Sequence, residues 1–442
     1  MQVVLQPAPC NEERALGWKH LSAWLRKQRL SRNFWIFFSA AFFFDAGFSV
    51  YFFLFNLYLL DFHFSDRSIG LIGGALTLGS LVGTLPAGFL AGKFGLRSLL
   101  AICFVSASLL NALRTLWMWE AAQIVLAFVA GVAMCMWGVC FLPAVARLTT
   151  EKTRTSAFSL IFSVSIGTSI VGGIVSGYLP LWFKAAGIAL QAAEIKRLIL
   201  LVACCIAFMS IVPLLYLRFP AQPQEEADGI PRTSKRWFHV LLHDPFLVRF
   251  LPLMALWAAV LAAFTPFANV YLSRELHIPL ARIGLIFSAT QALQFAMGLL
   301  VPLIVRALGL IHGIVATQVI AALALIAMAI SGNGSLAIAL YLVFSAAQWA
   351  SSPVLYNLLM NKTPDQHRST AAAMALFSNA FAATFATSGA GSLFTRFGYK
   401  PVLLGIAGLA LVAAMLFRIL IPPQRPVTSA AVAVACLEEG NR

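Results

Sequence analysis

Asp45 is the residue most able to do chemistry, because it lies inside a long apolar stretch that reads Phe42-Phe43-Phe44-Asp45-Ala46-Gly47. In a membrane-spanning helix, a charge at the bilayer centre costs about 2.5–3.5 kcal/mol, so the side chain normally faces protein or water. Protonation removes that charge, and such a group can therefore take up and release a proton. We predict that Asp45 binds a proton or a cation. The alternative is a purely structural carboxyl that is hydrogen-bonded to neighbouring helices.

Three further side chains share a helical face with Asp45. Ser49, Phe52 and Asn56 follow it at spacings of four, seven and eleven residues, which places them along one side of a helix. This stripe would let water or a solute reach the acid. For Asn56, and for Asn269 at the matching position of the repeat described below, we favour hydrogen bonding between helices, which is common in membranes.

Other apolar stretches also carry polar or aromatic side chains that could line a solute cavity. Taken singly, each of them is more often a packing or hydrogen-bonding residue than a ligand: Trp137, Trp257, Gln291, Gln294, Gln348, Ser352 and Asn379. Arg114 lies near the end of its stretch, where we expect its long side chain to reach the membrane surface. We find no catalytic constellation, no metal-ligand spacing and no nucleotide-binding glycine loop. We therefore predict neither an enzyme nor a cofactor.

The elements that position these side chains are predicted to be membrane helices. Of the 442 residues, 60% are hydrophobic and only 11% are charged, and the mean hydropathy is +0.87. A soluble domain of this length would need far more charge to cover its surface. Apolar stretches of about 20 or more residues, each long enough to cross a bilayer, recur from Phe34 to Ile421.

These stretches predict an all-α polytopic membrane protein with twelve transmembrane helices. The predicted spans are 33–60, 68–92, 97–118, 121–147, 156–183, 197–218, 247–272, 281–307, 309–331, 334–360, 369–395 and 399–421. A longer polar stretch with several prolines separates the sixth span from the seventh. The predicted organisation is a cytoplasmic N-terminal segment (1–32), a six-helix bundle (33–218), a cytoplasmic linker (219–246), a second six-helix bundle (247–421) and a cytoplasmic tail (422–442).

The net charge of +15 does not indicate nucleic-acid binding, because most basic residues fall in alternate loops. This distribution follows the rule that cytoplasmic loops are enriched in Lys and Arg. We expect a multi-pass protein of a bacterial-type cell (inner) membrane, with both termini in the cytoplasm.

The two halves of the chain resemble each other at a shift of 213 or 214 residues. Asn56-Leu57-Tyr58-Leu59 matches Asn269-Val270-Tyr271-Leu272, and Ile69-Gly70-Leu71 matches Ile283-Gly284-Leu285. An ordered series of such matches indicates an internal repeat of two six-helix bundles. Asp45 corresponds to Ala258, so the shared architecture does not require an acid there.

The loop after the second span reads Gly88-Phe89-Leu90-Ala91-Gly92-Lys93-Phe94-Gly95-Leu96-Arg97. With the repeat and the twelve spans, it resembles the loop pattern G-x-L-x-D-[RK]-x-G-[RK] of the major facilitator superfamily. Gly88, Lys93, Gly95 and, one residue later than the pattern places it, Arg97 carry the likeness, whereas Gly92 replaces the aspartate. The resemblance implies two pseudo-symmetric bundles around a central cavity that opens alternately to each side, with the first, fourth, seventh and tenth spans lining the cavity.

Charges in the corresponding loops could form a latch between the halves. We expect Lys93 and Arg97 to pair with Asp365, and Arg306 to pair with Glu151. Arg154 and Arg368 lie beside these acids in equivalent loops. The alternative is that these charges only determine the topology.

Together, these features predict a proton-coupled secondary transporter, acting as a monomer, that moves a small neutral or cationic, partly lipophilic solute, with export slightly favoured. A strongly anionic substrate would require more convergent Arg or Lys. The alternatives are an importer or facilitator of a small polar nutrient and, in a different class, a membrane sensor or scaffold that transports nothing. The expected partners are the solute, protons and the lipid bilayer.

Overall fold

The computed structural model describes residues 30–187, 190–219, 244–364 and 367–421, and within these ranges it contains helices and no strand. The first half comprises α2 (Arg32–Asp61), α3 (Asp66–Phe94), α4 (Leu96–Leu116), α5 (Glu120–Leu148), α6 (Glu151–Ala185), α7 (Ala192–Phe208) and α8 (Ile211–Tyr216). The second half comprises α10 (Pro245–Phe264), η2 (Thr265–Phe267), α11 (Ala268–Arg274), α12 (Leu280–Leu308), α13 (Leu310–Ile330), α14 (Gly334–Lys362), α15 (Arg368–Phe397) and α16 (Tyr399–Leu420).

The predicted twelve membrane helices are confirmed. Eleven helical segments are long and apolar enough to cross a bilayer, and α3 is a twelfth that bends by 47° between Thr84 and Pro86. Proline bends a helix because it lacks a backbone N–H and its ring clashes with the preceding turn. Most of the predicted N-terminal segment, most of the linker and the whole tail lie outside the described residues.

Two spans that the sequence predicts as continuous are broken in the structure. The sixth span consists of α7 and α8, separated at Met209 and Ser210, and the seventh passes through the short 3₁₀ helix η2 before it continues as α11. Pro213 and Pro266 lie at these breaks, where each removes one backbone donor from the helical ladder.

Single glycines form three of the tightest turns between helices. Gly95, Gly309 and Gly398 each end one helix and begin the next, with φ angles of 79°, 78° and 75°. Residues with a Cβ rarely adopt this region, so glycine is favoured there. Gly95 and Gly309 occupy equivalent places in the two halves, which accords with the internal repeat.

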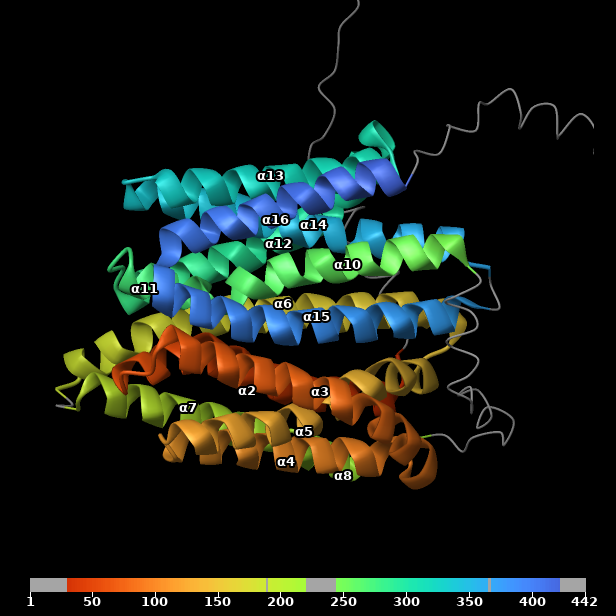
Figure 1. Cartoon of the computed structure of the whole chain (residues 1–442). Helices are drawn as coiled ribbons and strands as arrows, with labels where there is room; N and C mark the ends of the chain where they lie inside the picture. Colours follow the sequence, from red (N-terminus) through yellow and green to blue (C-terminus); the bar gives the residue numbers. More distant parts are fainter. Residues whose placement is uncertain (1–29, 188–189, 220–243, 365–366, 422–442) are drawn as a thin grey trace, which may run out of the picture.

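Figure 1 shows the helices of the two halves running roughly along a common direction, with the first half below and the second half above. The halves meet where α3 packs on α15 and where α6 packs on α12. A Cβ on Gly70 would lie 2.9 Å from the Cα of Gly391, and one on Gly284 would lie 3.0 Å from the Cα of Gly177. Small residues allow this close approach of helix backbones. We call this end of the bundle, where α2 ends and α12 begins, the closed end.

The opposite end of the bundle, which carries Gly95, lacks such contacts along α3. A Cβ on Gly88 or Gly92 would meet no atom within 4 Å. Phe89, on the same turn of α3, is 68% exposed. We call this end the open end, because the close approach of α3 to the second half is confined to the closed end.

We predict that Gly284→Val will force the halves apart at the closed end. Its side chain would overlap the backbone of Gly173 and Gly177 on α6, and overpacking of this kind typically costs about 1–3 kcal/mol. The distance between spin labels at positions 62 and 397, both at the closed end, should increase.

Gly298→Val is the matched control on the same helix, because the nearest atom to its Cβ would be Trp349 Nε1 at 3.8 Å. It should leave the label distance unchanged. A folded Gly284→Val protein with an unaltered distance would contradict the proposed role of this contact.

Candidate functional site

Asp45 lies near the middle of α2 and is half-buried. The hydroxyl of Ser165 on α6 is its hydrogen-bonding partner. One turn further along α2, Ser49 Oγ donates to the backbone oxygen of Thr168, also on α6, at 3.3 Å. The polar face of α2 at this depth is therefore directed at α6 within the first half.

Asp45 is electrostatically isolated within the described helices. The other charged residues in these helices all lie within five positions of a helix end. Helix ends lie near the polar headgroups, where charged side chains can reach water. Among the described spans, Asp45 is therefore the one Asp, Glu, Lys or Arg at mid-membrane depth.

In the second half, two of the candidate polar side chains, Gln294 and Gln348, bond to side chains of neighbouring elements. Gln294 Nε2 donates to Ser345 Oγ at 2.7 Å, and Thr265 Oγ1 donates to Gln348 Oε1 at 3.2 Å. These bonds connect α12 to α14 and η2 to α14. Gln294 and Gln348 therefore join neighbouring helices within the second half.

Three other candidates retain unused hydrogen-bonding capacity. Gln291 and Ser352 are half-buried, and no hydrogen bond joins either side chain to another described residue. The Oδ1 atom of Asn379 is buried and has no partner among the described residues. Unsatisfied buried acceptors are costly and uncommon, so these groups are candidates for binding a ligand.

Asp45, Ser352 and Asn379 lie at similar depths. Asp45 is 13 residues from the start of α2, Asn379 is 11 from the start of α15, and Ser352 is 10 from the end of α14. These three helix ends all belong to the open end. At a rise of about 1.5 Å per residue, the positions differ by about 5 Å along the bundle. The three side chains therefore lie at one level of the bundle, two of them in the second half.

The two tryptophans among the cavity candidates are packed within their own halves. Trp257 is 2% exposed, and its buried Nε1 donates to Ser351 Oγ at 2.8 Å. Trp137 on α5 stacks on Phe37, with ring centroids 6.0 Å apart, and packs against Phe104 on α4 at 5.7 Å. In this structure Trp257 serves to pack and join helices of the second half, and Trp137 contributes mainly to the core of the first half. A cavity role for either tryptophan stays a prediction.

Asn56 and Asn269 form a reciprocal pair of hydrogen bonds between the halves. Asn56 Nδ2 donates to the backbone oxygen of Pro266 at 2.9 Å, and Asn269 Nδ2 donates to that of Phe53 at 3.1 Å. Both donors and both acceptors are separated by 213 residues, so the bonds obey the pseudo-symmetry of the repeat. The structure thus shows the interhelical hydrogen bonding that we favour for both residues.

An ion pair that the sequence analysis missed lies at the same end. Arg274 Nη1 is 3.0 Å from Asp66 Oδ1, and Arg274 Nη2 donates to the backbone oxygen of Phe64 at 2.8 Å. The pair joins α11 of the second half to the start of α3 in the first. Its members are 208 residues apart and occupy non-equivalent positions, so the repeat carried no signal for it.

The predicted gating residues lie at the open end. Arg97 Nη2 donates to the backbone oxygen of Leu215 within the first half at 2.5 Å, and Lys93 lies over the ring of Phe94. Arg368 Nε donates to the backbone oxygens of Met360 and Thr363 at 3.0 and 3.3 Å. Asp365 and the side chain of Glu151 lie outside the described residues. The pairing of Lys93, Arg97 and Arg306 with these acids therefore stays a prediction. The role of Arg154 in gating also stays a prediction.

Arg114 does not reach the membrane surface as predicted. It is 2% exposed, donates from Nη1 to Asn111 Oδ1 at 3.0 Å, and stacks on the ring of Phe55, 4.4 Å from its centroid. The side chain turns inward because α2 offers an aromatic face that can hold a cation.

Comparison with known families accords with this architecture. A sequence profile described as Major Facilitator Superfamily matches residues 37–387, and again residues 263–435. The chain belongs to the Major Facilitator Superfamily. This multi-pass membrane protein therefore has a transporter fold, and its superfamily membership agrees with the resemblance carried by the Gly88–Arg97 loop. No match was found among curated protein sequences.

Solved structures of other superfamily transporters are similar in fold. The nucleoside transporter NupG aligns with a TM-score of 0.73 and 14% identity over 89% of this chain and 100% of its own. The xylose transporter XylE from E. coli, in an inward open conformation, gives 0.65 and 16% over 90% and 98%. A bacterial homologue of the human lysosomal transporter Spinster, inward-facing and occupied, gives 0.69 and 12% over 89% and 98%. Identities this low demonstrate the shared fold alone.

We predict that Asn56→Ala and Asn269→Ala each weaken the closed end to a similar extent. A hydrogen bond between membrane helices contributes about 0.6 kcal/mol on average, so each substitution should shift the closed-to-open equilibrium about threefold. The measurement is the population of each label distance between positions 62 and 397.

Asn361→Ala is the control, because Asn361 bonds to Asn357 on its own helix at 2.6 Å. It should leave the populations unchanged. Unequal effects of the two reciprocal variants would contradict the symmetric role proposed for the pair.

Proposed function

We propose that this protein is a proton-coupled secondary transporter of a small neutral or cationic, partly lipophilic solute, working by alternating access. The observation that carries the proposal is the isolation of Asp45 as the single described acid or base far from a helix end. A proton or cation is the natural counter-charge for such a group. No described basic residue lies at the same depth to bind an anionic solute.

The contacts of α6 offer a route from proton binding to movement of the halves. Ser165 on α6 partners Asp45, and two turns along the same helix Gly173 approaches the backbone of Gly284 on α12. A change in the charge of Asp45 alters its bond to Ser165, and thus the contact of α2 with α6. The same helix contacts the second half at the closed end, so proton binding and rocking of the halves share one element.

The free polar groups of Gln291, Ser352 and Asn379 suit a neutral solute with hydroxyl or amide groups. Phe52 is 41% exposed on the Asp45 face of α2 and could contact an apolar part of the solute. Among the structurally similar transporters, one is named for nucleosides and another for xylose. Both names are compatible with a neutral solute, although the likeness itself extends only to the fold.

Charge distribution supports an orientation for this conformation. Basic residues concentrate in the loops at the open end, which the positive-inside rule assigns to the cytoplasm. On this basis both termini are cytoplasmic, the membrane is the cell (inner) membrane, and the structure faces inward. We propose export in exchange for protons; import of a polar nutrient is the alternative.

We predict that Asp45→Asn will abolish proton-driven accumulation while leaving solute exchange intact. The amide keeps the size and hydrogen-bonding capacity of the carboxyl but cannot change its protonation state. The measurement is uptake by proteoliposomes with and without an imposed pH gradient, using nucleosides, sugars and amphiphilic amines as test solutes.

Asp45→Glu is the matched control and should retain coupling, because it keeps an ionisable carboxyl. Undiminished gradient-driven flux in Asp45→Asn would refute proton coupling through this residue. If the unmodified protein binds a solute but moves none of the panel in either direction, the sensor or scaffold alternative is favoured instead.

We further predict that Gln291→Leu and Asn379→Leu raise the KM for the transported solute. Loss of one hydrogen bond of about 0.5–1.5 kcal/mol corresponds to a change of about 2- to 10-fold. Asn361→Leu is the control, since Asn361 already bonds to Asn357 on its own helix at 2.6 Å; it should leave the KM unaltered. KM values in Gln291→Leu and Asn379→Leu that equal that of the unmodified protein would exclude both residues from solute binding.

A further inference from the structure

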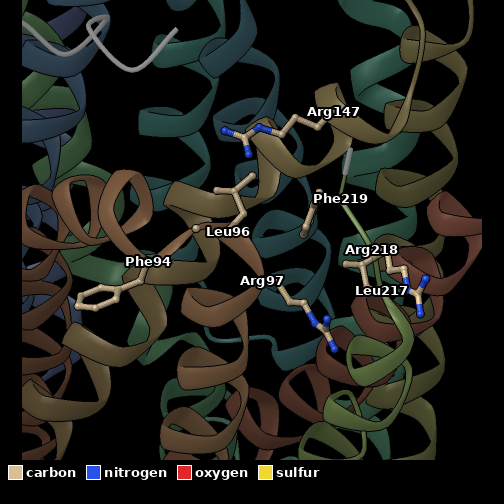
Figure 2. A pocket seen from close by; sticks show the side chains of 8 residues that line it. Phe94, Leu96, Arg97, Arg147, Leu217, Arg218 and Phe219 are labelled. Carbon is tan, nitrogen blue, oxygen red and sulfur yellow. The ribbon is translucent and has the colours of Figure 1, made fainter. Parts of the chain in front are cut away.

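A basic pocket of about 480 Å³ lies at the open end, apart from the Asp45 region. The ends of α3, α5 and α8 and the start of α4 surround it. Its lining includes Arg97, Arg147 and Arg218, together with the apolar side chains of Phe94, Leu96 and Phe219. Figure 2 shows Arg97 and Arg218 extending to the same side, with Arg147 across Leu96 and Phe219 from them.

The positive charge of this pocket is uncompensated within the described structure. The ion pairs in the described structure join Lys196 to Asp61 and Arg274 to Asp66, and neither pair includes an arginine of the pocket. No described carboxylate lines the pocket. Three arginines line one space without a described carboxylate. Arg97 Nη2 already donates to the backbone oxygen of Leu215, and the remaining N–H groups of the three arginines favour binding of an anion with several oxygen atoms.

The start of α4 adds further donors to the same pocket. Gly95, which precedes the helix, supplies no side-chain cap, and Gly95 and Leu96 are part of the lining. The first backbone N–H groups of a helix have no partner within it, and such groups can donate to the oxygen atoms of an anion. The pocket thus combines side-chain cations with backbone donors.

The surroundings indicate that the anion belongs to a lipid. The pocket is level with the ends of membrane spans, where the headgroup phosphates lie. Large apolar side chains are exposed on the helices that extend from it towards the bilayer centre, including Ile102 on α4 (50%) and Leu215 on α8 (62%). These side chains offer a surface for an acyl chain below a headgroup held in the pocket.

We propose that this pocket binds the phosphate of an anionic lipid headgroup. All of its lining residues belong to the first half or directly follow it, so rocking of the two halves leaves the site intact. The lipid would anchor the first bundle to the cytoplasmic leaflet while the second bundle moves. The chemistry that is recognised is a phosphate group with net negative charge, which inorganic phosphate shares.

One competing occupant is encoded in the chain itself. Glu225, Glu226 and Asp228 follow Phe219 closely in the sequence, and their carboxylates could satisfy the same arginines. We favour the lipid because the apolar surface below the pocket suits an acyl chain and not a polar linker.

The test is native mass spectrometry of the purified full-length protein in detergent, titrated with phosphatidylglycerol or with zwitterionic phosphatidylcholine. We expect one phosphatidylglycerol to bind in preference to phosphatidylcholine. Each of Arg97→Gln, Arg147→Gln and Arg218→Gln should lower its affinity about fivefold, the effect of removing about 1 kcal/mol per basic residue. The corresponding lysine variants should keep most of the affinity. Arg418→Gln, which removes an exposed arginine near the end of α16, should have no effect.

Two further experiments identify which group occupies the pocket. Displacement of phosphatidylglycerol by millimolar inorganic phosphate would assign the site to phosphate itself, with the lipid as one source. If phosphatidylglycerol binds only after Glu225→Gln, Glu226→Gln and Asp228→Asn are combined, the linker occupies the pocket and the lipid proposal fails. Equal binding of the two lipids, or unchanged binding in all three arginine variants, would also overturn it. Circular dichroism of each variant shows whether it remains folded.

Discussion

The constraint on which this structure depends is that the bilayer core offers no hydrogen-bond partners to a polypeptide. Each span must therefore satisfy its own backbone groups, and every described span is helical. The same constraint moves charged side chains to the helix ends, where water is available. Breaks such as the one at Thr265–Phe267 are tolerated inside the protein, where a neighbouring helix supplies a partner. Here Asn56 donates to the carbonyl oxygen of Pro266.

Contact between the halves follows from a second limit: helices in lipid gain little from burying apolar side chains against each other. Backbones must approach closely or polar groups must bond across the interface, and the closed end uses both. Glycines on α3, α6, α12 and α15 allow the approach. The asparagine pair and the Arg274–Asp66 ion pair add specific bonds. These contacts are few and are confined to one end of the bundle.

Polar groups in the interior divide into two kinds. Gln294, Gln348 and Trp257 already have side-chain partners in their own half, so their chemistry is used to position helices. Asn379 retains an unpaired acceptor. Spacing along a helix cannot separate these kinds, because both look alike as single polar residues in an apolar stretch. The pairing depends on which neighbouring helix lies opposite.

Sequence alone determined the helical class, the number of spans, the internal repeat and the isolation of Asp45. Hydropathy, charge and periodicity are local properties of the chain, and they decide which segments are stable in a bilayer. Only the tertiary structure decided which half-to-half contacts exist. The partners of Arg274, the inward turn of Arg114 and the gathering of Arg97, Arg147 and Arg218 around one pocket depend on how helices distant in sequence are placed. Those placements result from the packing of whole helix faces, and no short sequence motif predicts them.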